Sequence, residues 1–213
     1  MAARYGRQMA LSRPFADRAE AGRRLAELVP ESDGDPVVLG LARGGVPVAA
    51  EVARTLGAPL DVLVVRKVGH PAQPEYALGA VSEDGVALPE GLPSELVDPQ
   101  RKEAQAQARR LRGERERLPL AGRDAIVVDD GLATGRSMTA AIEGVARQGA
   151  ARVVMAVPVA SGPGIRALAE RCETCAVLVV EPPAFFAVGQ FYDDFEQVSD
   201  EAVAELLGSG GNA

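Results

Sequence analysis

The sequence predicts an α/β protein whose mostly parallel, twisted sheet has helices on both faces. Short continuous runs of Val, Ile and Leu alternate along the chain with segments of helical periodicity, which is the pattern of parallel strands buried on both sides. The 213 residues are 47% hydrophobic and 25% charged, as is ordinary for a globular protein with one well-filled core. We therefore expect one domain with an appendage rather than two large domains.

The predicted strands and helices follow one another in regular order. Strands are expected at the aliphatic runs 36–41, 60–66, 125–130, 152–159 and 175–180. Helices are expected where apolar residues recur at helical spacing, at 16–29, 46–57, 101–117, 136–149 and near 163–171. The second of these helices ends on Gly57, a residue type that often ends helices.

The segment between the second strand and the charged helix has a different pattern. HPAQPEYALG at 70–79 contains two prolines and a glycine, which predicts a loop. ALGAVSEDGVAL at 77–88 predicts a hairpin that turns near Glu83, Asp84 and Gly85.

Composition and charge exclude several classes of function. The net charge of −7 argues against bulk nucleic-acid binding, which requires a basic face. Residues 101–117 carry seven Lys or Arg against three Glu, and we interpret them as a solvated helix with charge pairs. The chain has no apolar run long enough to span a membrane and no signal-peptide pattern at its N-terminus. We expect a cytoplasmic protein.

The cysteines Cys172 and Cys175 form a C-x-x-C pair at the predicted end of a helix rather than at its start. The helix dipole would oppose thiolate formation there. We therefore favour buried small residues over a zinc or redox site.

The informative loops should follow the strands, because ligands of such sheets bind beyond the carboxyl ends of the strands. LARGG (41–45), RKVGHPAQPEY (66–76) and DDGLATGRS (129–137) are in such positions. The stretch 182–195 holds five of the eight aromatic residues, so it is a candidate for contact with a flat ligand.

The loop at 131–135 has the chemistry of an anion site. A small-residue loop that opens a helix offers backbone N–H groups beside the positive end of the helix dipole. Thr134 and Ser137 add hydroxyl donors, whereas Asp129 and Asp130 would repel a phosphate and require sugar hydroxyls, a cation, or both. A sugar phosphate meets all these demands; the alternative is an ordinary turn with two helix-capping acids.

The stretch VVDDGLATGRSM (127–138) resembles the phosphoribosyl-pyrophosphate (PRPP) signature of the type I phosphoribosyltransferases. From FADRAEAG to FYDDF and SDEAV, the chain is also similar to bacterial phosphoribosyltransferases whose acceptor is unassigned. The resemblance implies the fold of that family, with a flexible loop or hairpin and a small hood. A single phosphoribosyltransferase domain would then span 1–213, with a core at about 15–181, a hood from about 1–14 and 182–198, and a C-terminal helix at about 199–208.

The resemblance also implies roles for particular residues. Asp129 and Asp130 would bind the ribose hydroxyls and Mg²⁺, directly or through water or those hydroxyls. Arg43 and Lys67 would join them as catalytic residues by binding the leaving pyrophosphate, while loop 68–79 closes. The remaining expected contacts are Gly44, Gly45 and Arg66 for the pyrophosphate, Ala133, Thr134, Gly135, Arg136 and Ser137 for the 5′-phosphate, and Phe186, Phe191 and Tyr192 for the acceptor.

The implied reaction is Mg²⁺-dependent transfer of the 5-phosphoribosyl group from PRPP to a nitrogenous, nucleobase-like acceptor, with release of pyrophosphate. Ala133 stands where 6-oxopurine enzymes of the family have an acid, which disfavours such an acceptor or requires another base, for which His70 and Glu75 are candidates. Two alternatives stay open: a PRPP-sensing regulator that binds RNA through 101–117, and a hydrolase of nucleotides or sugar phosphates. A homodimer is common in the family.

Overall fold

The computed structural model describes residues 4–5, 14–32, 34–168, 174–180 and 185–209. Within these residues, six strands form one sheet in the order β1-β9-β8-β7-β2-β3, and each neighbouring pair is parallel. They are β1 (Arg4–Tyr5), β2 (Pro36–Leu41), β3 (Leu60–Leu63), β7 (Asp124–Val128), β8 (Arg152–Ala160) and β9 (Thr174–Val180). The expected mostly parallel sheet is confirmed.

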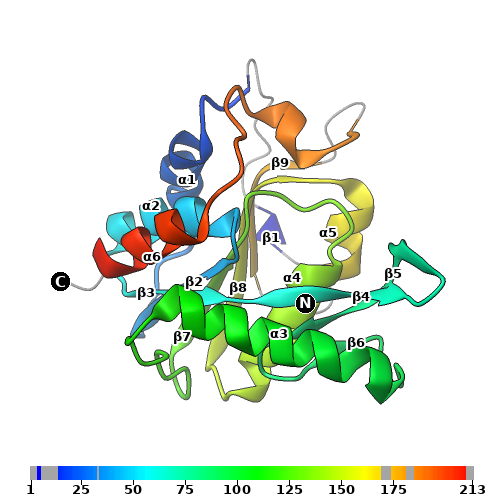
Figure 1. Cartoon of the computed structure of the whole chain (residues 1–213). Coiled ribbons are helices and arrows are strands. Elements are labelled where there is room, and N and C mark those ends of the chain that lie inside the picture. Colours follow the sequence, from blue (N-terminus) through cyan, green and yellow to red (C-terminus); the bar gives the residue numbers. More distant parts are fainter. Residues whose placement is uncertain (1–3, 6–13, 33, 169–173, 181–184, 210–213) are drawn as a thin grey trace.

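Helices cover both faces of this sheet (Figure 1). They are α1 (Arg18–Ala26), α2 (Gly45–Leu56), α3 (Ser94–Arg112), α4 (Arg136–Arg147), α5 (Gly162–Leu168) and α6 (Asp200–Ser209), with a 3-10 turn η1 (Val188–Phe191). Successive strand residues face opposite sides. Val38 and Ile126 belong to the core under α1, α2, α3 and α6, and Val37 and Val127 to the core under α4 and α5.

The predicted loop at 70–79 is wrong, because this segment is a β-hairpin. β4 (Val65–His70) and β5 (Gln73–Ser82) pair antiparallel, and β6 (Ala87–Leu88) joins them in a second sheet. Pro74 is tolerated in β5 because β6 pairs only with residues 80–81, so that β5 has an open edge at the proline. The hairpin expected at 77–88 is confirmed by the pairing of Ala80 with Leu88. The β4–β5 hairpin projects from the body of the molecule (Figure 1).

Two expected boundaries also differ. The run 60–66 is divided between β3 and β4, because the chain leaves the main sheet at Val64. The charged helix begins at Ser94 and ends at Arg112, where Gly113 has a positive φ of 61°, so that residues 113–117 lie beyond the helix. Cys175 is buried in β9, as expected for a small core residue, and Cys172 lies outside the described residues.

A buried ion-pair cluster joins the second sheet to the main one. Arg112 at the end of α3 lies 2.8 Å from Asp61 of β3 and 2.7 Å from Glu83, which follows β5. All three side chains are less than a tenth exposed. Burial lowers the pKa of Arg112, but the hydrogen bond and charge of Glu83 and the charge of Asp61 more than offset this and raise it. Arg112 therefore stays charged and holds two otherwise unpaired carboxylates.

We predict that Arg112→Met strongly destabilises the fold, because it leaves Asp61 and Glu83 buried without a cation. The expected loss is about 3–5 kcal/mol of unfolding free energy, or roughly 10 °C in Tm. Thermal and urea denaturation measure it. Arg109→Met, at an exposed position of the same helix, is the control and should change stability by no more than about 0.5 kcal/mol. Equal stability of the two variants would contradict the role given to the cluster.

Candidate functional site

Two loops meet at the carboxyl end of the main sheet, after the neighbouring strands β2 and β7. Asp129 and Asp130 directly follow β7. A Cβ on Gly44 would lie 2.1 Å from the Asp130 Oδ2, and one on Gly45 would lie 2.8 Å from the Asp129 Cα. Glycine is needed at both positions because the loop after β2 packs directly on the two acids. The space that the two glycines leave is therefore occupied by the acid pair.

Each of these loops opens a helix. The loop after β2 contains a cis peptide bond between Ala42 and Arg43 and leads into α2 at Gly45. The loop after β7 leads into α4 at Arg136, with Gly135 as a left-handed N-cap at φ 77°. The first N–H groups of a helix have no partner within the helix, and the dipole is positive there. The acid pair is thus flanked by two helix N-termini suited to anions.

The Asp130 residue is held from both its side chain and its backbone. The Arg18 Nε, at the first residue of α1, donates to the Asp130 Oδ2 at 3.0 Å. The Tyr192 hydroxyl donates to the Asp130 carbonyl oxygen at 2.6 Å. Burial raises the pKa of Tyr192, and the nearby Asp130 charge raises it further, so that the phenol stays a hydrogen-bond donor.

The acid pair lies in an environment that penalises its negative charge. Burial raises the pKa of Asp129 well above its usual range, and the Asp130 charge adds to this. Burial also raises the pKa of Asp130, although the Arg18 charge opposes the shift. Donors such as sugar hydroxyls, or a cation, would relieve this penalty.

The residues present fit Mg²⁺ only as an ion that a substrate helps to bind. Among the described residues, no group of three or more His, Cys, Asp or Glu could hold a metal. Two carboxylates are nevertheless the protein contribution that Mg²⁺ commonly uses when phosphates and waters supply the other ligands.

Residues 131–138 form the signature loop, which α5 supports from below. The Ser161 hydroxyl donates to the Ala133 carbonyl oxygen, and the Gly164 N–H donates to the Ser161 Oγ at 3.0 Å. A Cβ on Gly164 would lie 2.8 Å from the Ala133 carbonyl oxygen. Leu132 is joined to β8 by backbone hydrogen bonds to Val159 and from Ser161. The loop is therefore fixed before any ligand binds.

Thr134 of the signature loop lines two cavities. One, of about 260 Å³, is lined by Lys67, Tyr76, Ala77, Gly79, Thr134, Arg136 and Ser137; we call it the hairpin cavity. The other, of about 440 Å³, is lined by Ala133, Thr134, Ser161, Gly162, Pro163, Phe185 and Phe186; we call it the hood cavity. The first has cationic side chains, and the second is mainly apolar with two aromatic rings.

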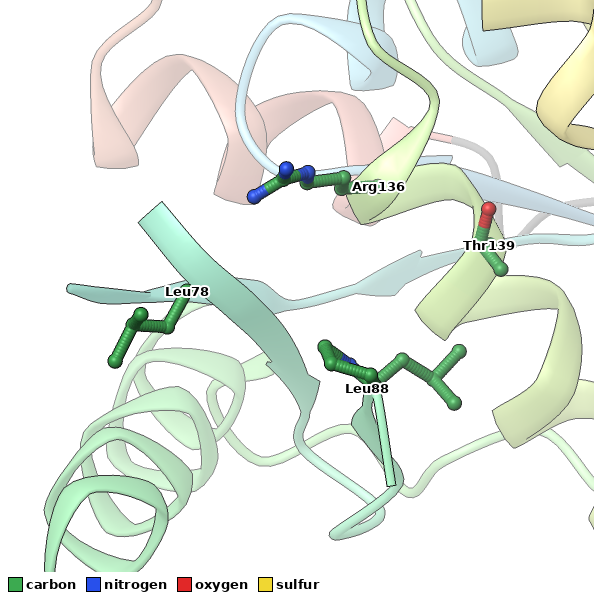
Figure 2. Close-up of a pocket in the computed structure, with 5 residues that line it drawn as sticks. Leu78, Leu88, Arg136 and Thr139 are labelled. Carbon is green, nitrogen blue, oxygen red and sulfur yellow. The ribbon is translucent and has the colours of Figure 1, made fainter. Parts of the chain in front are cut away.

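A third cavity, of about 290 Å³, lies on the other side of Arg136. It is lined by Arg136 and Thr139 of α4, Leu78 of β5, Leu88 of β6 and Pro89, which Figure 2 shows as sticks. The Arg136 Nη1 also donates to the Ala77 carbonyl oxygen. Arg136 therefore ties the start of α4 to the hairpin and separates this cavity from the hairpin cavity.

The cationic residues expected at the pyrophosphate are placed differently from one another. Lys67 is exposed and lines the hairpin cavity. Arg66 points to the opposite side of β4, where its guanidinium donates to Gln100 at 3.2 Å and Gln107 at 3.4 Å on α3. Alternate strand residues face opposite ways. Arg66 therefore faces α3 and does not line the hairpin cavity, contrary to the expected contact with pyrophosphate. Arg43 is 41% exposed in its side chain and lies 3.6 Å from Asp200 of α6.

The aromatic stretch is partly structural. The Tyr192 ring is buried between the rings of Phe15 and Phe195, with centroid distances of 5.4 Å and 5.0 Å. It therefore has no free face for the acceptor contact that the sequence predicted. Phe191 packs against Phe185. Phe186 is 87% exposed and lines the hood cavity.

The C-terminal part of the expected hood is bonded to the first residues of the expected core. Residues 191–194 pair through backbone hydrogen bonds with residues 15–16. Most of 1–14 lies outside the described residues, as do 182–184, and residues 4–5 form the edge strand β1 of the main sheet.

Of the two candidate bases, His70 does not line the hood cavity, and the side chain of Glu75 lies outside the described part of the chain. The His70 Nδ1 accepts the Ala72 N–H at 3.1 Å in the turn of the hairpin.

Arg18 and Ser161 contact the candidate site, through Asp130 and Ala133, and sequence reasoning missed both. Arg18 lies within FADRAEAG, a segment that carried the family resemblance, but helical periodicity alone made it an ordinary surface position. Ser161 follows a strand end, which is the one signal that indicated a site position.

The comparisons with known proteins agree with this geometry. The model of the phosphoribosyl transferase domain family matches residues 16–195. A Mycobacterium tuberculosis protein named "putative phosphoribosyl transferase" is 46% identical over 205 residues, which cover 91% of this chain and 46% of that protein. The chain thus spans about half the length of the curated relatives that it matches.

Solved structures show the same fold. A protein from Thermus thermophilus is 45% identical, with a TM-score of 0.81 over 93% of this chain and 100% of that one. A purine phosphoribosyltransferase of Pyrococcus horikoshii is 18% identical, with a TM-score of 0.51 over 85% of this chain and 92% of its own; this likeness concerns the fold alone. The match over 16–195, together with the acid pair and the signature loop, shows that the chain belongs to the phosphoribosyl transferase domain family.

Proposed function

We propose that this protein transfers the 5-phosphoribosyl group from PRPP to a nitrogenous acceptor and releases pyrophosphate, with Mg²⁺ as cofactor. The observation that carries the proposal is the arrangement of the two cavities, one cationic and one aromatic, on either side of the signature loop at Thr134. A group transfer at one carbon needs a leaving-group side and an acceptor side. The cytoplasmic location and the homodimer expected from the sequence stay predictions.

The acid pair and the signature loop would bind the ribose phosphate. The N–H groups at the start of α4 and the hydroxyls of Thr134 and Ser137 suit the 5′-phosphate. Asp129 and Asp130 would accept from the ribose hydroxyls, which supply the donors that two partly buried carboxylates need. Their negative charge would also stabilise the positive charge that develops on the ribose as its bond to pyrophosphate breaks.

The leaving group would be bound on the side of the hairpin cavity. Lys67 lines this cavity, and the N-terminus of α2 adds the positive end of a helix dipole. The acids Asp129 and Asp130 would hold Mg²⁺ together with substrate oxygens, and the ion would neutralise charge on the departing pyrophosphate. The β4–β5 hairpin corresponds to the expected mobile loop 68–79, and its closure to exclude water is part of the proposal.

The acceptor would enter the hood cavity. Phe186 offers an exposed aromatic face there, suited to a flat heterocycle. An acceptor nitrogen attacks the ribose carbon as the carbon–oxygen bond to pyrophosphate breaks, and the nitrogen then gives up its proton. Because Ala133 cannot take that proton, we disfavour a 6-oxopurine acceptor.

The contacts of α3 weaken the regulator alternative. Within 101–117, the segment considered for RNA, Arg112 is buried in the ion-pair cluster, and Arg110 pairs with Asp200 at 2.8 Å. Of Arg109, Arg110 and Arg112, only Arg109 is exposed without an assigned pair among the described residues. No observation favours a hydrolase over the transferase.

We predict that PRPP binds saturably and that replacement of both acids by Asn weakens it. The change removes charge-assisted acceptors for the ribose hydroxyls and the metal, so we expect at least about tenfold weaker binding. Calorimetric titration with PRPP, with and without Mg²⁺, measures it, and an acceptor panel followed by pyrophosphate release tests the transfer. Asp98→Asn, at a half-exposed position of α3 where the carboxylate pairs only with Arg101 among the described residues, is the control. Unchanged PRPP affinity in a folded double variant would exclude the proposed site.

We predict that Lys67→Gln and Arg66→Gln differ in their effect on pyrophosphate release. Lys67 lines the hairpin cavity, whereas Arg66 faces α3, so only the first change should remove a charge from the leaving group. The expected loss in kcat for Lys67→Gln is about 100-fold, against less than about threefold for Arg66→Gln. Equal losses in both variants would contradict the assignment of Lys67 alone to the leaving group, and a larger loss for Arg66→Gln would mean that the hairpin turns its other face to the substrate.

We predict that Phe186→Ala raises the KM for the acceptor and leaves PRPP affinity unchanged. The ring contributes stacking on the acceptor side only, which corresponds to about three- to tenfold in KM. Steady-state kinetics at saturating PRPP give the acceptor KM, and calorimetry gives the PRPP affinity. A parallel loss of PRPP affinity would show that Phe186 supports the signature loop rather than the acceptor.

A further inference from the structure

Arg18 lies closer to the candidate site than its place on a helix indicates. Its guanidinium bonds the Asp130 carboxylate at 3.0 Å, donates from Nη1 to the Glu196 carbonyl oxygen at 2.8 Å, and stacks on the Phe195 ring at 3.9 Å from the centroid. The side chain is only 12% exposed, whereas that of Arg23 on the same helix is 58% exposed. The structure thus holds the Arg18 charge rigidly on one acid of the pair.

The third nitrogen of this guanidinium lies beside the loop after β2. A Cβ on Gly44 would be 3.5 Å from the Arg18 Nη2 and 2.1 Å from the Asp130 Oδ2. Arg18 therefore stands at the junction of the acid pair and the loop proposed to receive pyrophosphate. One guanidinium can bond a carboxylate and still direct an N–H toward a second anion, because its donors lie in a planar fork.

The positive charge of Arg18 offsets part of the negative charge that gathers in the site when a ligand binds. Two adjacent carboxylates and a polyanionic ligand repel each other, and partial burial strengthens that repulsion. A divalent metal is the usual means of neutralising it. Arg18 supplies part of the same positive charge from the protein itself, at the acid whose carboxylate lies against Gly44.

We propose that Arg18 is the resident counter-ion of the acid pair and that it allows PRPP to bind without Mg²⁺. The inference rests on the proposed function, because it takes PRPP as the ligand. Arg18 acts mainly by positioning and neutralising Asp130. Mg²⁺ then strengthens binding at the leaving group without being required to assemble the site.

The test is calorimetric titration of PRPP into wild type, Arg18→Gln and Arg18→Lys, each in EDTA and in saturating Mg²⁺. We expect wild type to bind in both buffers. Arg18→Gln should lose about tenfold or more in EDTA and no more than about threefold in Mg²⁺, because the metal replaces the missing charge. Arg18→Lys should recover most of the EDTA binding. Arg23→Gln, an exposed arginine of the same helix, is the matched control, and melting curves confirm folding of each variant.

The possible outcomes separate the two proposals. Equal weakening of Arg18→Gln in both buffers would mean that Arg18 only ties α1 to the hood, and it would overturn this inference alone. Wild-type binding that requires Mg²⁺ would overturn it as well. Failure of wild type to bind PRPP in either buffer would overturn the proposed function and this inference with it.

Discussion

The contact between the Asp130 carboxylate and its surroundings is the constraint on which the site depends. A carboxylate that is only 15% exposed needs compensating partners, and here these come from distant parts of the chain. Arg18 of α1 neutralises the carboxylate, Gly44 leaves room for it, and Tyr192 binds the backbone carbonyl of the same residue. The start of α1, the loop after β2 and the segment around Tyr192 are thereby placed relative to β7. Local sequence determines each of these segments, but this one polar junction brings them together.

The elements predicted from the sequence are those whose signal is local. β2, β7 and β8 are continuous aliphatic runs buried on both faces, so composition alone indicates them. The β4–β5 hairpin carries the opposite signal, since Pro71, Pro74 and Gly79 are typical of loops. It forms because β5 pairs with β4 on one edge and packs against α3 and α4, and such tertiary contacts override local propensity.

In the candidate site, too, the residues with a local sequence signal were predicted, and those placed by tertiary contacts were not. The acid pair and the signature loop form one continuous stretch, so their proximity could be read from the sequence. Arg66 and Lys67 are neighbours in the sequence, and the strand period requires them to face opposite sides, but only the position of α3 determines which one faces the cavity. Arg18 lies 112 positions from Asp130. No local pattern can indicate that a surface-like helical arginine bonds an acid so distant in the chain.

A fixed loop between two differently lined cavities is also a solution to a chemical problem. A phosphoribosyl transfer must expose one ribose carbon to an acceptor while its opposite side still holds a polyanion. Ser161 and Gly164 fix the loop through the Ala133 carbonyl, so the loop itself need not move during the proposed reaction. Among the described residues, the two exposed large hydrophobic side chains are Tyr76 and Phe186, and each lines one of the two cavities. Single exposed rings are ordinary on a protein surface, but these two lie at the borders of the two cavities. Under the proposed reaction, the rigid part of the site would position the ribose, and the exposed rings at its borders would cover the leaving group and the acceptor.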